Sequence, residues 1–538
     1  MSSETSPIEL DVLVIGAGFA GLYQTYKLKQ AGFKFLTVEA ADDVGGTWYW
    51  NRYPGARCDI VSVEYSYSFD EDLQQEWEWS ERYAAQPEIL RYAQHVADRF
   101  GLREHIRFNT RIVSAIWDDE RARWVSTAED GTVFDSQFIV TAVGCLSAPK
   151  PPEIDGFEDF NGEVYFTSRW PHEPVDFTGK RVAVIGTGSS GVQSIPIIAK
   201  EADQLTVFQR TAVYTLPALN RPTDPEEMAR IKANYKELRE RAKTMRTGLI
   251  VPRGTKSAHE ATPEERKAAF DACWDEIGIF ACLAATFTDL HTDEEANRYA
   301  AEYVHERIRQ IVKDPQTADD LIPRGYPFAA KRVCLDSGYY ETFNRENVRL
   351  VNLRRDPIVC ITENGIQTAS ELHEFDVIVF ATGFDAVTGP LLRLGIQGRD
   401  GLALADVWRE RPATYMGLQV AGFPNLFTLT GPGSPGVLSN VMVSIEQHVE
   451  WVSETLEDLR DRGIRTMEAT PEAQEKWFEE NNRLAEGTLY VKADSWFMGA
   501  NVPGKPRFFM LYMGGVPLYR EICEEVRANG YTGFVLAA

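Results

Sequence analysis

The chain has 538 residues and a mass of 60.6 kDa, a length that predicts about three domains. Hydrophobic residues make up 44% and charged residues 25% of it, proportions that exclude a fibrous or largely disordered protein. The 56 basic and 80 acidic residues give a net charge of −24, which argues against nucleic acid or an anionic membrane surface as the partner. Local basic pockets for a phosphate remain compatible with this charge.

The targeting and cysteine patterns predict a cytoplasmic protein that is not inserted in a membrane. The start, MSSETSPIEL, has neither the basic nor the apolar region of a secretory signal. The apolar runs are far shorter than the roughly 20 residues of a membrane helix. Seven scattered cysteines without a CxxC spacing predict free thiols in a reducing compartment. The eight histidines are equally scattered, so no metal site is expected.

Three buried strands are predicted, each leading into a glycine-containing turn. They are Asp11–Ile15 before GAGFAG at 16–21, Arg181–Ile185 before GTGSSG at 186–191, and Asp376–Phe380 before ATG at 381–383. Helical patterns follow the first two turns, at Leu22–Ala31 and Val192–Ala202. Continuous β-branched runs are typical of parallel strands covered on both faces. The pattern therefore predicts an α/β fold with two Rossmann-type dinucleotide-binding domains.

Between the second and third strands the chain becomes rich in Glu, Lys, Arg and Ala, which predicts a helical insertion. Three helix starts recur there, with Asp224, Thr262 and Thr292 each placed three residues before a glutamate, as in a capping box. A further helix is predicted at Ser444–Arg462 and is expected to pack against the first domain.

The first glycine turn predicts a site for FAD or NAD. Gly16, Gly18 and Gly21 let backbone N–H groups approach a pyrophosphate at a helix N-terminus. The next strand, Phe35–Val38, ends in Glu39. A carboxylate there accepts hydrogen bonds from ribose hydroxyls and repels a 2′-phosphate.

The second glycine turn differs at the residue that ends its next strand. Gly186, Gly188 and Gly191 repeat the pattern, and the strand Leu205–Gln209 ends in Arg210. A cation at this position favours the 2′-phosphate of NADP. One acidic and one basic dinucleotide site predict a flavoprotein that is reduced by NADPH.

The segment GGTWYWNRYPGARCD at residues 45–59 lies between the two sites. Its paired glycines permit a close approach of the backbone to a ring or phosphate. Its aromatic residues could wall a flat cofactor, but the same stripe also fits ordinary core packing. Asp59 places a carboxylate after the turn Tyr53-Pro54-Gly55.

These motifs together resemble those of the Baeyer–Villiger monooxygenases. Residues 45–59 match the family pattern GGxWxxxxYPGxxxD at every fixed position. The resemblance continues through FNGEVYFTSRWP (160–171), YPFAAKR (326–332), ATGFDA (381–386), GPGSPGVLSN (431–440), SIEQHVEW (444–451) and SWFMGANVPGKP (495–506). The chain is most similar to the phenylacetone and steroid monooxygenase branch. This implies an NADPH-dependent enzyme that uses FAD, O2 and a flavin C4a-peroxide to convert an apolar ketone into an ester or lactone.

The resemblance also implies roles for individual residues. The catalytic arginine falls on Arg332, with Asp59 as the carboxylate that pairs with it and positions it. A permanent guanidinium stabilises developing anions without giving up its proton. The implied FAD contacts are Gly16, Gly18, Gly21, Glu39, Gly46, Thr47, Trp48, Asp59 and Tyr65. The implied NADP contacts are Arg57, Gly186, Thr187, Gly188, Ser189, Ser190, Gly191, Gln193, Arg210, Thr211, Lys331, Arg332 and Trp496. The implied substrate pocket is Gly436, Val437, Leu438 and Trp496, with Trp496 on a mobile loop that closes the site.

One position departs from the family pattern. The fingerprint FxGxxxHxxxWP has Phe166 where the family has histidine, and a phenyl ring cannot donate or accept the hydrogen bonds of an imidazole. This places the coupling of NADPH oxidation to oxygenation in question. An NADPH oxidase with weak coupling and an N- or S-oxygenating flavin monooxygenase therefore remain alternatives. A disulfide reductase would need a redox cysteine pair near the first glycine turn, but only Cys58 lies in residues 16–144. A non-enzymatic redox sensor would not require Arg332 and Asp59 together.

The predicted domains are a discontinuous FAD-binding domain at 1–148 and 384–538, an NADP-binding domain at 149–221 and 321–383, and a helical insertion at 222–320. The sequence leaves open the physiological ketone, the carbon that migrates and the oligomeric state.

Overall fold

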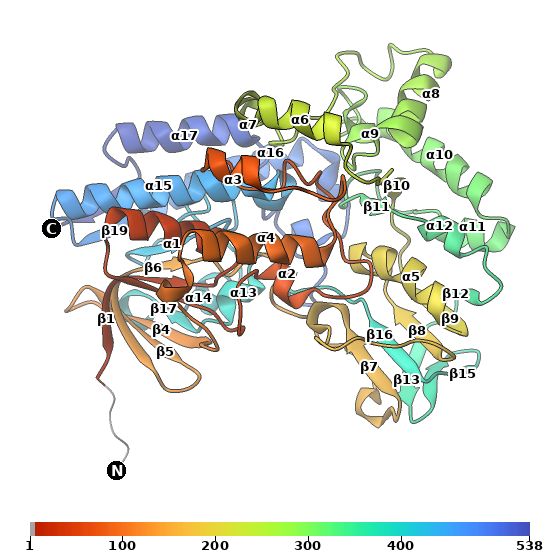
Figure 1. Cartoon of the computed structure of the whole chain (residues 1–538), viewed down its shortest axis with the longest axis horizontal. Helices are drawn as coiled ribbons and strands as arrows, with labels where there is room; N and C mark the ends of the chain where they lie inside the picture. Colours follow the sequence, from red (N-terminus) through yellow and green to blue (C-terminus); the bar gives the residue numbers. More distant parts are fainter. Residues whose placement is uncertain (1–5) are drawn as a thin grey trace.

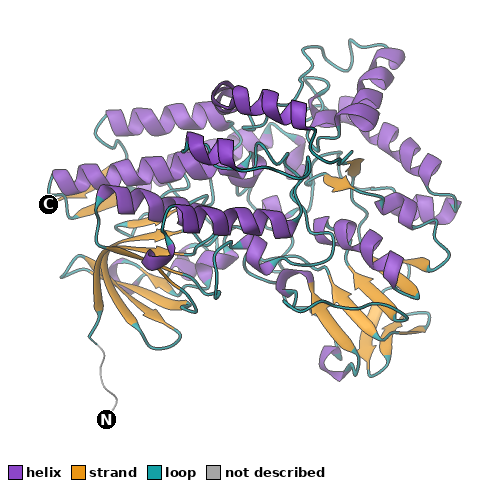
Figure 2. Ribbon diagram, viewed as in Figure 1, coloured by secondary structure: helices purple, strands orange, loops and turns teal. Residues whose placement is uncertain are grey.

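The computed structural model describes residues 6–538, so residues 1–5, which begin the predicted FAD domain, lie outside it. Two α/β lobes, each with its own sheet, lie side by side below a layer of helices (Figure 1, Figure 2). The helices of residues 225–321 cover the upper end of the second lobe, and the C-terminal helices lie above the first (Figure 1).

The first lobe is built on an eight-stranded sheet whose main path is β17-β4-β5-β6-β1-β2-β3, with β18 also paired to β6. The central pairs of β1 with β2 and β6 are parallel, whereas β4, β5 and β6 are antiparallel neighbours. Val12, Leu13 and Val14 of β1 are fully buried, as expected for a strand covered on both faces. The strands are β1 (Ile8–Ile15), β2 (Phe35–Val38), β3 (Ile106–Arg107), β4 (Ile112–Asp118), β5 (Arg123–Ala128), β6 (Val133–Thr141), β17 (Ile396–Gln397) and β18 (Leu426–Thr428).

The second lobe is built on a five-stranded, fully parallel sheet with the order β12-β9-β8-β16-β7. Its strands are β7 (Glu163–Phe166), β8 (Arg181–Ile185), β9 (Gln204–Gln209), β12 (Val348–Asn352) and β16 (Val377–Phe380). An antiparallel meander of β13 (Ile358–Thr362), β14 (Gly365–Thr368) and β15 (Leu372–Glu374) extends this lobe. The two pairs β10–β11 (Thr215–Pro217, Cys334–Asp336) and β19–β20 (Thr466–Ala469, Phe534–Ala537) complete the sheets named here. The predicted fold of two Rossmann-type units with a helical insertion is confirmed.

Three long helices begin three residues earlier than their apolar patterns predict. Helix α1 is Phe19–Ala31, α5 is Ser189–Glu201 and α15 is Val441–Asp461. The first turns of α1 and α5 lie inside the glycine turns, where the apolar period is not yet visible. Helix α15 packs along α1, and Gln24 of α1 donates a hydrogen bond of 3.0 Å to Ser453. The prediction that this late helix packs against the first domain is thus confirmed.

The insertion contains α6 (Pro225–Ala233), α7 (Tyr235–Thr244), α8 (Pro263–Ala272), α9 (Cys282–Ala285), α10 (Glu294–Ile311) and α11 (Pro315–Leu321). Asp224 caps α6 and Thr262 forms a capping box with Glu265, as predicted. The prediction for Thr292 is wrong by one residue, because Asp293 is the residue whose side chain accepts from the third backbone N–H, that of Ala296.

The prediction that all cysteines are free is wrong for two of them. Cys273 and Cys282 form a disulfide within the insertion, whereas Cys58, Cys145, Cys334, Cys360 and Cys523 are free. A π-helical turn at Cys273–Ile277 and the short helix α9 bring the two sulfur atoms together. A spacing of nine residues carries no disulfide signature of its own. Over residues 6–538, no helix combines the length and the apolar character that crossing a bilayer requires.

Candidate active site

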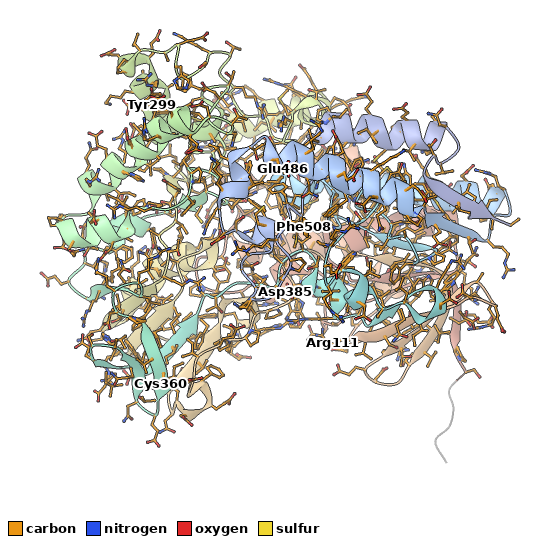
Figure 3. All side chains as sticks on the ribbon, turned by 180° about the vertical axis from the view of Figure 1, so that it is seen from behind. Arg111, Tyr299, Cys360, Asp385, Glu486 and Phe508 are labelled. Carbon is orange, nitrogen blue, oxygen red and sulfur yellow. A yellow bond between two sulfur atoms is a disulfide. The ribbon has the colours of Figure 1, made fainter. Side chains whose placement is uncertain are left out.

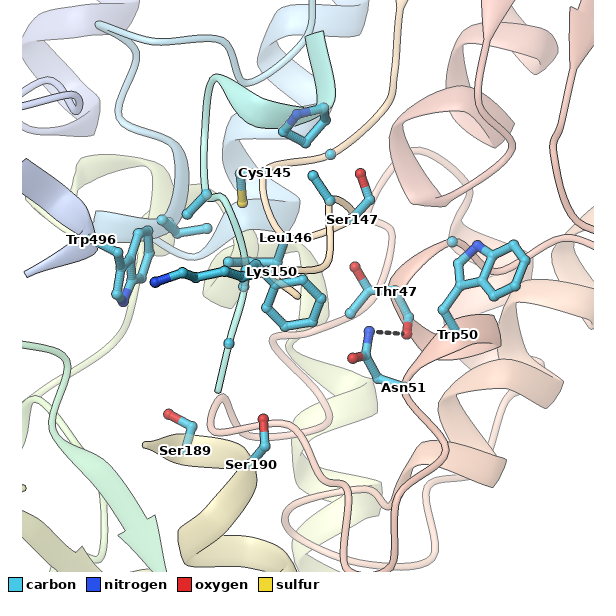
Figure 4. Close-up of a pocket in the computed structure, with 18 of the residues that line it drawn as sticks. Thr47, Trp50, Asn51, Cys145, Leu146, Ser147, Lys150, Ser189, Ser190 and Trp496 are labelled. Atoms are coloured by element: carbon cyan, nitrogen blue, oxygen red, sulfur yellow. Dashed lines mark hydrogen bonds between the residues drawn. The ribbon is translucent and has the colours of Figure 1, made fainter. Parts of the chain in front are cut away.

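A single continuous cavity of about 1120 Å³ lies where the two lobes meet. It is larger than the usual range for one small ligand, roughly 300–1,000 Å³, and both glycine turns open into it. Figure 4 shows Thr47, Trp50 and Asn51 on one side, Ser189 and Ser190 on another, and Trp496 opposite, with Lys150 extending toward it. Because both glycine turns line it, the cavity is placed to bind a dinucleotide at each of them.

The first glycine turn lies against the end of β6. Gly16 has φ +106°, and a Cβ there would lie 2.6 Å from the carbonyl oxygen of Ala142, so only glycine permits this approach. Gly18 and Gly16 line the cavity. Gly21 does not, because it faces the backbone of Gly16, where an added Cβ would clash at 1.8 Å. Gly21 therefore serves the packing of α1 on β1.

Glu39 directly follows β2 and lies in the cavity wall with its side chain largely buried. Its carboxylate accepts hydrogen bonds from the N–H groups of Ala17 at 2.7 Å and Ala41 at 2.8 Å. Burial raises the pKa of Glu39, and these backbone donors oppose the rise. A carboxylate has about four acceptor sites, so it retains capacity for ribose hydroxyls.

Three arginines that the sequence analysis did not select surround this end of the cavity. Arg111, Arg169 and Arg393 line it, and Arg169 lies 4.2 Å over the ring of Trp50. Burial lowers the pKa of Arg169, and the nearby charges of Arg111 and Arg393 lower it further. They come from three distant segments, so no local sequence pattern marks them.

The aromatic segment 45–59 forms a wall of the same site. Gly46, at φ +52°, lies so close to the first glycine turn that a Cβ on it would be 2.8 Å from Cα of Gly18. Trp48 and Tyr65 both line the cavity, and the indole N–H donates to the Tyr65 hydroxyl at 3.1 Å. Thr47 begins the helical turn α2 (Thr47–Trp50) and also faces the cavity. The aromatic residues of this segment therefore line the cofactor site and also pack in the core.

The second glycine turn repeats the geometry of the first in the other lobe. Gly186 has φ +108°, with the carbonyl oxygen of Ala381 2.5 Å from a built Cβ. Thr187, Gly188, Ser189 and Ser190 line the cavity at the start of α5, whereas Gly191 packs against Gly186 behind it. The free N-terminal N–H groups of α5 make this a site for an anionic pyrophosphate.

A group of basic side chains lies beside this turn. Arg210, Thr211 and Lys331 line the cavity. Burial lowers the pKa of Lys331. The charge of Asp494 opposes this fall, whereas the neighbouring charges of Arg210 and Arg354 add to it. Like charges held together in this way indicate an anion site. Arg354, which donates to the carbonyl of Arg210 at 3.0 Å, was not predicted.

The two lobes meet through the turn at residues 53–57. Gly55, at φ +81°, lies against α5, where a Cβ would be 2.3 Å from the carbonyl oxygen of Gln193. Tyr53 donates to Gln193 at 2.8 Å, and Gln193 donates to the carbonyl of Arg57 at 2.9 Å. The Arg57 guanidinium pairs with Glu81 and donates to the carbonyl of Tyr83. Both Gln193 and Arg57 line the cavity.

Arg332 and Asp59 form a two-pronged ion pair in the cavity wall. Nε and Nη2 of Arg332 donate to the two Asp59 oxygens at 2.8 and 2.9 Å, and Nη1 donates to the carbonyl of Val437 at 2.8 Å. Burial acts to lower the pKa of Arg332, but the charge and hydrogen bonds of Asp59 outweigh it and raise that pKa. Three of the five guanidinium N–H groups are thus used, which leaves two for a ligand.

Only two of the four residues predicted for the substrate pocket line the cavity. Val437 and Trp496 line the cavity, but Gly436 and Leu438 do not. Trp496 begins a helical turn at Trp496–Met498 and packs on a small cluster of Ala386, Val387 and Met510. Phe166 is outside the cavity. It stacks on Phe380 of the neighbouring strand, with ring centroids 5.2 Å apart.

Comparison with known proteins decides the family. Residues 13–248 match the model of the pyridine nucleotide-disulphide oxidoreductase family. An acetone monooxygenase (methyl acetate-forming) of Gordonia sp. is 43% identical over 99% of this chain and 100% of its own. A Baeyer–Villiger monooxygenase of Pseudooceanicola batsensis is 41% identical over 99% of this chain and 97% of its own. The chain belongs to the Baeyer–Villiger monooxygenases.

Two solved structures and a further relative are similar to nearly the whole chain. A steroid monooxygenase bound to NADP superposes with a TM-score of 0.94 at 48% identity, covering 98% of this chain and 99% of its own. The OTEMO complex with FAD and NADP has a TM-score of 0.95 at 43% identity, covering 99% and 100%. A phenazine N-monooxygenase of Lysobacter antibioticus is 40% identical over 98% of this chain and 97% of its own. The predicted family, enzyme class and FAD and NADP cofactors are confirmed.

Proposed function

We propose that this Baeyer–Villiger monooxygenase inserts one oxygen atom into an apolar ketone, with Arg332 as its central cation and Asp59 as the residue that positions it. The observation that carries the proposal is the pair itself, which lies in the wall of a cavity reached by both dinucleotide turns. The balanced reaction is ketone, O2, NADPH and a proton to ester or lactone, water and NADP+.

The residues present fit both cofactors. Gly16, Gly18 and the start of α1 provide a pyrophosphate cradle, while Glu39 provides acceptors for a ribose. The second turn has the same cradle, with Arg210 and Lys331 beside it for a 2′-phosphate. When bound, FAD reduced by NADPH supplies the activated oxygen for the insertion.

The residues of this chain provide charge, orientation and exclusion of water. Asp59 pairs with the charge of Arg332 and fixes the plane of the guanidinium, so its two remaining N–H groups can stabilise negative charge that develops on oxygen. Arg332 therefore acts without losing its proton. Val437, Leu146 and Trp496 supply apolar surface, which favours an apolar ketone and keeps water away.

Product analysis tests this function. The purified holoenzyme is given NADPH, O2 and a panel of cyclic, aryl and steroid ketones, and products one oxygen atom heavier are sought by mass spectrometry. Esters or lactones are the expected products. NADPH consumption that yields only hydrogen peroxide across the whole panel would contradict the proposal and support the NADPH oxidase alternative.

Heteroatom oxygenation is a second candidate, favoured by the phenazine N-monooxygenase among the relatives. The same panel therefore includes a thioether and an aromatic N-heterocycle. A sulfoxide or N-oxide with every ketone untouched would replace the first proposal by this one.

We further propose a cytoplasmic location, supported by the use of NADPH, which is regenerated there, and by the five free cysteines. The buried Cys273–Cys282 disulfide is the exception to the reduced state expected in that compartment. Cell fractionation with activity measured in each fraction tests this, and activity confined to a membrane or secreted fraction would contradict it.

A further inference from the structure

The Arg332 guanidinium also contacts an aromatic ring, which has no role in the proposed function. Phe280 of the insertion lies against it, with Cζ of Arg332 4.0 Å from the ring centroid. Asp59 and the carbonyl of Val437 hold the edge of the same group. The guanidinium is thus fixed in its plane by hydrogen bonds and on one face by a ring.

Phe280 lies inside a covalently closed loop. The disulfide joins Cys273 and Cys282, and both residues are buried, with 2% and 1% of their surface exposed. Within the loop, Gly278 donates to the carbonyl of Cys273 at 3.3 Å and Cys282 donates to that of Ile279 at 2.9 Å. The ring therefore comes from a short segment whose two ends are bonded to each other.

Contacts from the FAD lobe hold the middle of this loop. Tyr83, itself fully buried, donates to the carbonyl of Gly278 at 2.6 Å, and Arg82 donates to that of Ile277. Gly278, at φ +59°, packs so closely on the chain that a Cβ would be 2.6 Å from the carbonyl oxygen of Ala218. These contacts hold the loop beside Arg332, and the disulfide limits how far the two ends of the loop can separate.

We propose that the Cys273–Cys282 disulfide is a positioning clamp that holds Phe280 on the face of Arg332, so that full oxygenation requires the oxidised loop. The inference rests on the proposed role of Arg332. A cation over an aromatic face is stabilised without being neutralised, so the ring can orient the guanidinium while its positive charge stays available. Phe280 is a positioning residue, because it acts through Arg332.

Opening the clamp is a balanced exchange. A dithiol or a water-soluble phosphine gives two electrons and, with two protons, converts the disulfide into two thiols. The dithiol becomes a disulfide, or the phosphine takes oxygen from water and becomes its oxide. Neither step involves the cofactors, so clamp opening and NADPH oxidation can be measured separately.

The test uses the FAD-loaded enzyme with a ketone that the wild type converts. In the double variant Cys273→Ser and Cys282→Ser, kcat for ester falls about 5-fold, as expected for loss of a contact of this kind, and more of the NADPH consumed appears as hydrogen peroxide. The KM for NADPH stays within about twofold. Cys360→Ser is the matched control, because Cys360 is a free cysteine in β13, at the end of the second lobe opposite to the insertion helix that carries Tyr299 (Figure 3).

Reduction of the disulfide in the wild-type enzyme is expected to lower activity in the same way, without a mutation. Treatment with the phosphine, followed by intact-mass measurement to count the hydrogens gained, reduces activity by the same factor, and the double variant does not respond. If the double variant fails to fold, this measurement decides. If the native disulfide resists reduction, the double variant decides.

Substitutions of Phe280 distinguish the positioning of Arg332 by the ring from a general effect of the loop on stability. Phe280→Tyr and Phe280→Trp retain the ester-to-peroxide ratio, whereas Phe280→Leu lowers it as far as the double cysteine variant, and combining the two changes adds little. Full activity and coupling without the disulfide, or in Phe280→Leu, would overturn the proposal. Failure of the wild type to oxygenate any ketone would instead overturn the proposed function.

Discussion

Arg332 is the residue in which charge, planarity and position combine. Its two bonds to Asp59 require a flat fork of N–H groups, which lysine lacks. Arg332→Lys is therefore expected to keep the positive charge but to lower ester formation about 100-fold, the scale of losing a placed donor to a developing anion. Ester and hydrogen peroxide are measured together. Arg483→Lys changes an exposed arginine that pairs with Glu480 and does not line the cavity, so it should leave the ester yield near that of the wild type. An unaltered yield in Arg332→Lys would contradict the prediction.

Phe166 is a packing residue at the position where the family fingerprint has histidine. Its ring stacks on Phe380 at 5.2 Å and also faces Phe157 at 6.0 Å, outside the cavity. Phe166→His is expected to cost about 1 kcal/mol of stability through lost aromatic packing, while the ratio of ester to NADPH stays within about twofold. Thermal unfolding and product counting check the two parts. A large rise in coupling would show that this position controls turnover.

At the scale of elements, the loop carrying Trp496 is attached to the segment that links the lobes. Lys505 pairs with Asp385 at 2.7 Å and donates to the carbonyl of Ala386 at 2.6 Å, and Asn501 donates to that of Phe384 at 2.6 Å. Lys505 is almost fully buried, with 8% of its side chain exposed. Replacing Lys505 leaves Asp385, whose side chain is 27% exposed, and the carbonyl of Ala386 without their partner, which weakens the attachment of the loop.

Lys505→Met is therefore expected to free this loop, to raise the KM for NADPH about tenfold and to increase hydrogen peroxide, because Trp496 then closes the cavity less often. Steady-state kinetics with a peroxide assay measures both. Lys492→Ala breaks an exposed ion pair with Glu294 elsewhere in the same region, and it serves as the control that should change neither value. Equal effects of the two variants would argue against a specific attachment.

The elements also show what the sequence can predict. The buried strands and both glycine turns were predicted because each is a local pattern with a local cause. The starts of α1 and α5 were misplaced by three residues because their first turns, residues 19–21 and 189–191, belong to the glycine motifs, where the sequence pattern predicts a turn before the helix. The contact of Phe280 with Arg332 and the arginines near Glu39 were missed because they join segments far apart in the chain. The disulfide was missed because a spacing of nine residues has no signature of its own, and a π-helical turn is needed to bring its two sulfur atoms together.

At the scale of the whole molecule, the site exists only where separate units meet. Asp59 comes from the segment after the first glycine turn, Arg332 from the chain that follows the insertion, and Val437 from the C-terminal part. The FAD-side turn at Gly55 fits directly against α5 of the other lobe. The family resemblance predicted roles for these residues, but their convergence on one guanidinium is a property of the folded chain.

A buried histidine connects the C-terminal helices to the cavity wall and makes the stability of the whole molecule depend on pH. Nδ1 of His448 in α15 accepts from the N–H of Thr430 at 2.9 Å, and Thr430 lines the cavity. Tyr519 of α17 (Val516–Ala528) gives its hydroxyl hydrogen to Met416, so its 2.8 Å contact requires Nε2–H of His448 to donate. Both nitrogens are therefore used in the neutral ring.

Burial lowers the pKa of His448 from 6.5 to about 3. The unfolded chain binds the proton near pH 6.5 and the folded chain does not, so this contribution to stability is complete above pH 6.5 and is lost as the pH falls toward 3. Between pH 6.5 and 5 the loss amounts to about 2 kcal/mol. His448→Gln removes the titration, so the advantage in melting temperature of the wild type over the variant should narrow between pH 7.5 and 5. A difference that is constant over this range would show that His448 is not the titrating group.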